Sequence, residues 1–170
     1  RTVGLFMLNY SHVITFLALV IAASIVSPHF MNSTNILNVV RGASMVGVVA
    51  IGMTVVILCR GIDLSAGSLV GVAAVTAAAL AGNGSPVAWG VALAITTALG
   101  VVNGLLITKL KLQPFIATLA MMIFARGCIY LYSDGGDVYA QGADPAFRWL
   151  GSGYIWIIPV PVVLFVAPWV

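Results

Sequence analysis

Long apolar runs separated by short polar segments are the feature of this sequence that most restricts its fold. An α-helix rises about 1.5 Å per residue, so about 20 apolar residues cross the hydrocarbon core of a bilayer. Hydrophobic residues occupy 62% of the 170 positions and charged residues only 6%, whereas about a quarter of a soluble domain is charged. A β-barrel would show short alternating segments instead. The sequence therefore predicts an all-α, polytopic transmembrane helical bundle and excludes a soluble enzyme, a nucleic-acid-binding protein and a disordered linker.

Six ranges satisfy this length rule, and Gly, Pro, Asn and Asp are concentrated between them. We expect spans near residues 9–26, 42–59, 64–81, 87–108, 115–132 and 154–170, all within a single transmembrane domain over 1–170. The chain begins with Arg1 rather than Met and stops at Val170 inside an apolar run. We therefore expect it to be a piece of a longer protein.

The distribution of Lys and Arg predicts the orientation, because cytoplasmic loops are enriched in these residues. With the N-terminus in the cytoplasm, the cytoplasmic bases are Arg1, Arg60, Lys109 and Lys111. Arg41 and Arg148 then lie outside, and Arg126 lies within the fifth span. This modest excess favours a cytoplasmic N-terminus.

No pattern of catalytic or metal-binding residues stands out. The sequence has no HExxH, no GxSxG, no Cys/His cluster and no GxxxxGK[ST] phosphate loop. We expect Cys59 and Cys128 to be free apolar thiols and the two histidines to lie near the interface. The sequence thus predicts no catalytic residues, no metal site and no cofactor, and any ATP hydrolysis would belong to a partner.

Small residues recur at helical spacing in the third and fourth ranges. Gly67 and Gly71 are four residues apart, and so are Gly100 and Gly104. Small side chains at this spacing let helices approach closely in lipid. The pattern predicts a packed bundle rather than an activity.

The segment RGIDLSAGS at 60–68 places two opposite charges between two apolar ranges. Ionisable groups at membrane depth are costly and normally pair or line a polar cavity. In one interpretation this is a tight cytoplasmic turn, with Asp63 capping the next helix and Arg60 among the headgroups. In the other it is a broken helix facing a pathway, and Arg60, Gly61, Asp63, Ser65 and Gly67 have a structural or gating role. The sequence alone favours the turn.

Three stretches resemble one known family. The run GMTVVILCRGIDLSAGSLVG at 52–71 resembles the signature of membrane permease subunits of ribose-type monosaccharide ABC importers. The stretches NGLLITKLKLQPFIATLAMMIFARG at 103–127 and DPAFRWLGSGYIWIIPVPV at 144–162 are similar to later parts of the same family, in the same order. Arg60 departs from the family pattern, which most often has Gly at that position.

The resemblance implies a multi-pass subunit of the bacterial inner membrane that imports a sugar such as ribose, xylose or a galactose-like monosaccharide. Its expected partners are a cytoplasmic ABC ATPase subunit, a periplasmic sugar-binding protein and a second permease copy or homologue. Such subunits are about twice this length, so the chain would be the N-terminal half. The alanine-rich coupling segment that docks on the ATPase belongs to the second half and is not found here.

Within the second motif, Asn103, Gln113 and Thr118 offer hydrogen bonds to a neutral, hydroxyl-rich solute. A buried Asn can equally hold helices together, and Gln113 before Pro114 can be simply interfacial. Arg126 either reaches outward to the headgroups or ties helices through a carboxylate or a helix C-terminus. The acidic stretch 133–153, with Asp134, Asp137 and Asp144, is either solvated or a docking surface for the binding protein.

Other functions remain possible from the sequence. A branched-chain amino-acid ABC importer permease is the nearest alternative, although the GIDLSAGS run argues for a sugar. An ion-coupled secondary transporter would usually place acids in mid-span, whereas Asp63 is the one acid near a span. A purely structural membrane subunit is a third alternative.

Overall fold

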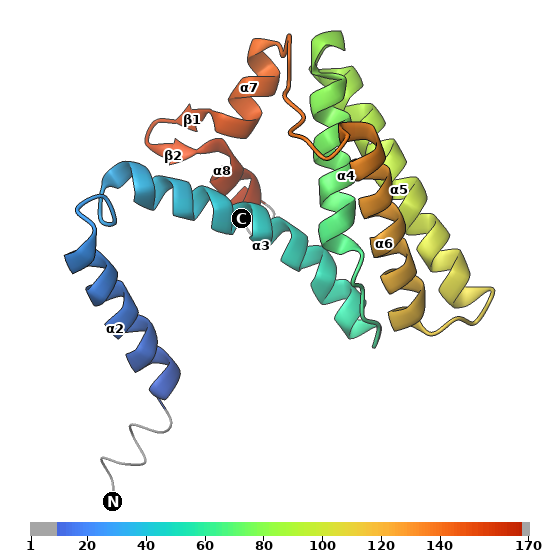
Figure 1. Ribbon diagram of the computed structural model, residues 1–170, viewed down its shortest axis with the longest axis horizontal. Helices are drawn as coiled ribbons and strands as arrows, with labels where there is room; N and C mark the ends of the chain where they lie inside the picture. The colour runs from blue at the N-terminus through green and yellow to red at the C-terminus, as the bar shows by residue number, and fades with distance from the viewer. Residues whose placement is uncertain (1–9, 168–170) are drawn as a thin grey trace, which may run out of the picture. The chain divides into compact units, whose positions relative to one another are not determined.

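The computed structural model describes residues 10–167, which are mostly helical (Figure 1). Arg1 and Asn9, which belong to the orientation and first-span predictions, lie outside the described residues. The elements are α2 (Ser11–Val26), α3 (Ser33–Leu58), α4 (Ala66–Ala79), the 3₁₀ turn η1 (Ala81–Asn83), α5 (Ser85–Thr108), α6 (Pro114–Ser133), α7 (Pro145–Ser152), β1 (Tyr154–Ile155), β2 (Ile158–Pro159) and α8 (Val160–Val166).

The described residues divide into two compact units, one ending at Ala43 and the other beginning at Ser44, and the single domain over 1–170 stays a prediction. The boundary falls within α3, which is continuous through it. In the first unit, α2 joins α3 through a polar turn. Asn32 Oδ1 accepts a hydrogen bond from Thr34 N at 3.2 Å, and Asn35 Nδ2 donates to Phe30 O at 2.8 Å. These short-range hydrogen bonds fix the start of α3.

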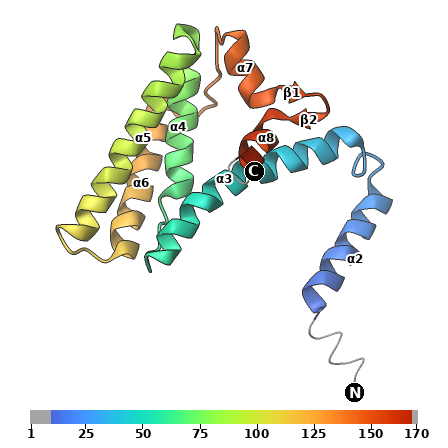
Figure 2. The same ribbon diagram turned by 180° about the vertical axis from the view of Figure 1, so that it is seen from behind.

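In the second unit, α4 packs against both α5 and α6, and α5 also packs against α6. The three helices lie side by side in both ribbon views (Figures 1 and 2). The residues buried between them are mainly small, and they include Ala88, Ala92, Ala117 and Ala125. Small side chains let the backbones approach closely, which is how helices associate in lipid.

The predicted glycine contacts occur at one of the four positions. A Cβ on Gly71 would lie 2.9 Å from Ile129 Cδ1, so α6 packs closely there. A Cβ on Gly67, Gly100 or Gly104 would meet nothing within 4 Å. The predicted packing of these helices is confirmed, and buried alanines such as Ala88 and Ala125 lie between them.

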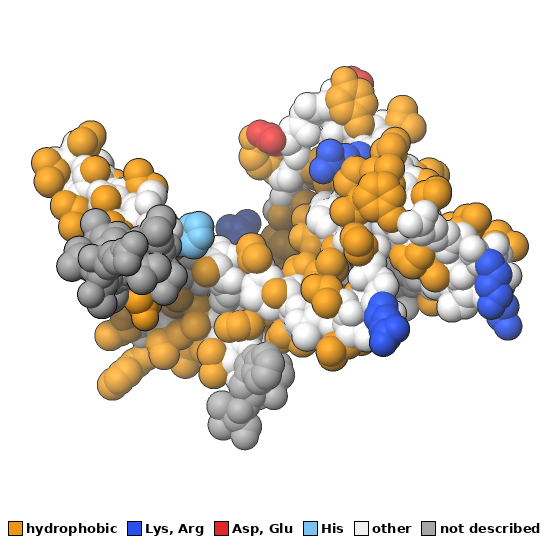
Figure 3. All heavy atoms as spheres, turned by 90° about the horizontal axis from the view of Figure 1, so that it is seen from below, with side chains coloured by type: hydrophobic (Ala, Val, Ile, Leu, Met, Phe, Trp, Pro, Cys, Tyr) orange, Lys and Arg blue, Asp and Glu red, His pale blue; other side chains and the backbone are white. Residues whose placement is uncertain are grey.

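Three helices are long and apolar enough to cross a membrane among the described residues, namely α3, α5 and α6, with 26, 24 and 20 residues. Helices α2 and α4 are apolar but shorter, and the 14 residues of α4 rise only about 21 Å. Hydrophobic side chains are widespread on the face drawn in Figure 3, and charged side chains are few. Large apolar residues such as Ile123 and Leu131 are exposed, as a lipid-facing surface requires.

The sixth predicted span, 154–170, begins differently from the prediction. Residues Tyr154–Ile155 and Ile158–Pro159 form an antiparallel hairpin, and helix α8 begins only at Val160. Pro159 and Pro161 explain the difference, because a proline ring clashes with the carbonyl one turn earlier in a continuous helix. The last residues of this range, 168–170, lie outside the described residues.

The connections of the three-helix group differ in net charge between the two ends. The α3–α4 and α5–α6 connections lie at one end and carry Arg60, Lys109 and Lys111 together with one acid, Asp63. The α4–α5 and α6–α7 connections lie at the other end, where the chain has Asp134, Asp137 and Asp144. The bundle is therefore basic at one end and acidic at the other.

Candidate functional site

The segment between α3 and α4 begins with a Schellman motif that ends α3. Gly61 N donates to Val56 O at 3.0 Å, and Arg60 N donates to Ile57 O at 2.9 Å. Arg60 has a left-handed backbone, with φ of 56°. Glycine is favoured at such a position because it has no Cβ to strain. This geometry gives a physical reason for the glycine that related signatures have in place of Arg60.

Asp63 organises the second half of the same connection. Its Oδ1 accepts hydrogen bonds from Ser65 N at 2.7 Å and from Ser65 Oγ at 2.6 Å. Ser65, rather than Asp63, is the N-cap residue of α4. The chain reverses direction here (Figure 1), so the segment is a turn between two helices and not an interruption of one. Asp63 therefore supports the cap residue through an Asx turn instead of capping α4 itself.

Two predicted residues reach this connection from other helices. Asn103 on α5 donates from Nδ2 to Ser65 Oγ at 3.0 Å. Thr118 on α6 has its hydroxyl 3.2 Å from Ile62 O and 2.8 Å from Pro114 O, so its single proton serves one of the two at a time. Ser65, Asn103 and Thr118 are all at least nine-tenths buried. Three helices thus share a buried polar cluster at one end of the bundle.

A groove of about 420 Å³ opens beside this cluster. We call it the connection groove, and its lining residues are Val55, Val56, Cys59, Gly61, Ile62, Asp63, Gly100, Asn103, Gly104, Ile107, Thr108, Pro114 and Thr118. The lining contains one carboxylate, one amide and two threonine hydroxyls, and no Lys or Arg. Gly100 and Gly104, whose Cβ positions are open, widen the groove instead of packing against a helix.

Two buried polar atoms near the cluster have no hydrogen-bond partner within the described part of the chain. They are Asn103 Oδ1 and Ser68 Oγ. Buried polar atoms are normally paired, so an unpaired acceptor beside a groove marks a place where a donor can bind. Ser68 was not singled out from the sequence, and its only signal is its spacing of one turn from Ser65.

The other predicted residues lie apart from this cluster. Gln113 is exposed at the N-cap of α6 and makes no side-chain cap hydrogen bond. Arg126 is exposed on α6, and the described residues provide it with no carboxylate partner. This exposure fits the alternative in which Arg126 reaches outward to the headgroups, and the tie between helices stays a prediction.

A second polar contact, which the sequence did not predict, lies at the opposite end of the bundle. Asp144 Oδ2 accepts from Ser85 N at 2.9 Å, and Oδ1 accepts from Ser85 Oγ and, at 2.7 Å, from Phe147 N. The hydroxyl and backbone hydrogen bonds of Ser85, together with that of Phe147 N, hold the pKa of the Asp144 carboxyl below its usual range. One carboxylate therefore caps both α5 and α7.

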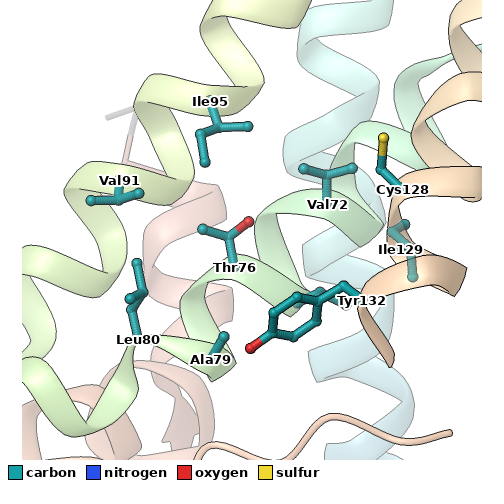
Figure 4. A pocket seen from close by; sticks show the side chains of 10 residues that line it. Val72, Thr76, Ala79, Leu80, Val91, Ile95, Cys128, Ile129 and Tyr132 are labelled. Carbon is teal, nitrogen blue, oxygen red and sulfur yellow. The ribbon is translucent and has the colours of Figure 1, made fainter. Parts of the chain in front are cut away.

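A separate pocket of about 320 Å³ lies among α4, α5 and α6 (Figure 4). Its walls are apolar apart from the hydroxyls of Thr76 and Tyr132 and the thiol of Cys128. Such walls offer little hydrogen-bonding chemistry. The connection groove, with its buried amide and carboxylate, is the better candidate site.

Apolar helices of membrane length around a groove without basic residues define a helical integral membrane protein. The chain belongs to the family described as branched-chain amino acid transport system / permease component, which it matches over residues 35–166. Members of this family are membrane subunits of transporters.

Relatives within this family are named for sugars. The chain is 36% identical to ribose import permease protein RbsC of Haemophilus influenzae, over 98% of this chain and 54% of the relative. It is 42% identical to RbsC of Bacillus subtilis, over 89% of this chain and 49% of the relative. It is 35% identical to galactofuranose transporter permease protein YtfT of Escherichia coli, over 90% of this chain and 47% of the relative.

The chain spans about half the length of the curated relatives that it matches. No solved structure matches it.

Proposed function

We propose that this chain is part of the membrane permease subunit of an ATP-driven importer, which moves a monosaccharide across the bacterial inner membrane. The observation that carries the proposal is the match to permeases named for ribose and galactofuranose along 89–98% of the chain. The relatives belong to a family of transport permeases. Transport, rather than catalysis, is the function that these observations support.

The chemistry of the connection groove fits a neutral solute. A sugar presents hydroxyl groups and carries no charge, so its path needs hydrogen-bonding groups and modest affinity. Asn103 and Thr118 supply an amide and a hydroxyl to a lining that is otherwise mainly apolar. We therefore assign these two residues to the substrate path, with Gln113 near its exposed end beside Pro114. The Asp63–Ser65 turn, Arg60, Gly61 and Gly67 would maintain the shape of the groove.

The proposed assembly includes a cytoplasmic ATPase subunit, a periplasmic sugar-binding protein and a second permease copy or homologue. ATP binding and hydrolysis would switch the permease pair between outward-open and inward-open states. The bases Arg60, Lys109 and Lys111 lie at one end of the bundle, and this supports a cytoplasmic position for that end and for the N-terminus. The acidic end would then face the binding protein.

An amino-acid substrate is the second candidate, since the family description names branched-chain amino acids. An amino acid carries both an ammonium and a carboxylate group, and its carboxylate calls for a basic or helix-terminal partner. The lining of the connection groove has no Lys or Arg. The names of the relatives, which are ribose and galactofuranose permeases, favour the sugar.

The proposal is tested on the complete permease purified in mild detergent from its own host. We expect a two-domain ATPase subunit to co-purify, and proteoliposomes containing the assembly and its binding protein to accumulate a labelled pentose or hexose only with ATP. Labelled leucine serves as the competing substrate. Uptake of leucine but not sugar would identify the amino-acid branch, and uptake driven by an ion gradient without an ATPase would overturn the proposal.

A further inference from the structure

The hairpin between α7 and α8 exposes an apolar tip. We define the hairpin tip as the four residues Ile155, Trp156, Ile157 and Ile158. Trp156 is 97% exposed and Ile157 is 71% exposed, and the two residues form the turn between β1 and β2. An indole this exposed to water is unfavourable, because its ring buries a large apolar area when it is covered. The hairpin tip therefore requires an apolar or amphipathic environment.

The base of the hairpin is fixed, so the tip points outward in a defined direction. Pro159 and Val160 are buried, and Val160 N donates to Gly153 O at 3.0 Å. Gly153 N in turn donates to Trp149 O at 2.7 Å, and a Cβ on Gly153 would clash with that oxygen. Helix α7, the hairpin and the start of α8 are thus joined at one glycine.

The position of the hairpin along the bundle follows from α5. The 24 residues of α5 rise about 36 Å, and the hydrocarbon core is about 30 Å thick. The first turn of α5 therefore lies near the membrane–water boundary. Asp144 binds Ser85, the first residue of α5, and caps α7, and Phe147 of α7 stacks on Trp89 of α5 with ring centroids 6.1 Å apart. These contacts hold the first turn of α7 at the level of the boundary, and the hairpin follows at the end of this eight-residue helix.

The chemistry of the hairpin matches this boundary. No residue from Trp149 to Val170 is charged, whereas a surface that binds a soluble partner usually has a polar rim. Two-residue strands leave backbone groups unpaired, and such groups are excluded from the hydrocarbon core. Trp and Tyr are enriched at membrane interfaces, where the ring lies among apolar groups and the polar atom meets water.

We propose that the hairpin tip inserts into the lipid at the membrane–water interface, with Trp156 at the level of the acyl carbonyls, and anchors the α7 end of the bundle. The hairpin is a lipid-binding surface in addition to any transport role. It fixes the depth of α7 and of the first turn of α5 relative to the headgroups.

The experiment measures tryptophan fluorescence of the complete protein in nanodiscs made with phospholipids brominated either near the carbonyl or near the methyl end of the acyl chains. Bromine quenches only a tryptophan in close contact, so the quenching that is lost in the Trp156→Phe variant reports this residue. We expect stronger quenching by the carbonyl-proximal bromine, and we expect Trp156→Phe to lose most of it. Trp149→Phe, at a half-exposed position on α7, is the matched control and should lose less.

Two outcomes would overturn the proposal. If acrylamide but not brominated lipid quenches the Trp156 component, the hairpin tip lies in water. If neither quencher reaches it, protein covers the hairpin tip. A Trp156→Gly variant favours the left-handed turn and should fold, yet it should also lose the lipid quenching. Sugar transport does not enter this measurement, so it is independent of the proposed function.

Discussion

The side chain of Asp144 binds Ser85 across 59 residues of sequence, accepting hydrogen bonds from both its backbone nitrogen and its hydroxyl. The same carboxylate accepts from Phe147 N at 2.7 Å. A carboxylate at a helix N-terminus satisfies free backbone donors and interacts favourably with the helix dipole. Since Asp144 does this for α5 and α7 together, it is the main polar link between α7 and the three-helix group.

The first prediction concerns the Asp144→Asn substitution. Asn keeps the shape of the side chain but removes the charge and one acceptor oxygen, so the links to α5 and α7 should weaken. We expect a lower melting temperature in detergent. Unfolding can be measured by the fluorescence of Trp89, whose ring stacks on Phe147. The control is Asp137→Asn, because Asp137 is exposed and its carboxylate accepts a hydrogen bond from the Tyr139 hydroxyl at 3.2 Å within the same loop. Equal melting temperatures for the two variants would show that the Asp144 link contributes no stability.

The same link predicts a dependence of stability on pH. The pKa of Asp144 is lowered on folding, so the unfolded chain binds the proton more readily than the folded chain. The stabilisation is therefore fully present above the ordinary pKa of Asp and is lost as the pH falls through the lowered folded pKa. We expect melting temperatures of the parent to decrease in acid, and Asp144→Asn to decrease less. Parallel acid curves for the two proteins would contradict this prediction.

Arg60 provides a test of the turn between α3 and α4. Its left-handed φ of 56° is unfavourable for any residue with a Cβ. Relief of this backbone strain in Arg60→Gly should therefore raise the free energy of unfolding by about 1 kcal/mol. The greater conformational entropy of glycine in the unfolded chain offsets part of this gain. Arg60→Ala removes the same charge without relieving the backbone, and denaturant titration should show no such gain. If both variants are stabilised equally, the charge rather than the backbone is responsible.

Apolar length and proline positions predict α5 and α6 well, whereas α3 begins at Ser33, nine residues before the predicted range 42–59. The predicted ranges 87–108 and 115–132 lie within two residues of α5 and α6, whose first turns are marked by Pro86 and Pro114. The range 154–170 failed because its composition does not separate a helix from a short hairpin. Only the positions of Pro159 and Pro161 reveal that a helix cannot run through it.

The polar site was predictable in part. The sequence identified Asn103, Gln113 and Thr118 as hydrogen-bonding candidates and the 60–68 segment as unusual, and two of those three candidates, Asn103 and Thr118, are buried in the cluster. It did not show that they meet, because the contacts to Ser65 and Ile62 cross 38 and 56 residues. The link from Ser85 to Asp144 crosses 59 residues and was not predicted either. An acidic residue in a loop is usually solvated, so nothing in the sequence indicated a partner for Asp144.

The hydroxyl of Thr118 tests the polar cluster. Thr118→Val keeps the volume but removes the donor to Ile62 O or Pro114 O, and it should lower stability by about 1 kcal/mol and reduce sugar uptake. Thr118→Ser keeps the hydroxyl and should retain uptake. Thr97→Val, at an exposed position on α5, is the matched control for the loss of a hydroxyl. Normal uptake by Thr118→Val would remove this residue from the proposed path.

Cys59 tests the proposed orientation, because it is exposed at the end of α3 and lines the connection groove. In a Cys128→Ala background, a membrane-impermeant maleimide should label Cys59 in inside-out vesicles and not in right-side-out spheroplasts. A Cys introduced at the exposed Asp137, in a background lacking both native cysteines, should show the reverse pattern, since Asp137 lies in the connection at the opposite end of the bundle. Excess transported sugar should slow the labelling of Cys59 if solute occupies the connection groove. Labelling of Cys59 from the outside would invert the orientation, and the acidic end would then face the cytoplasm.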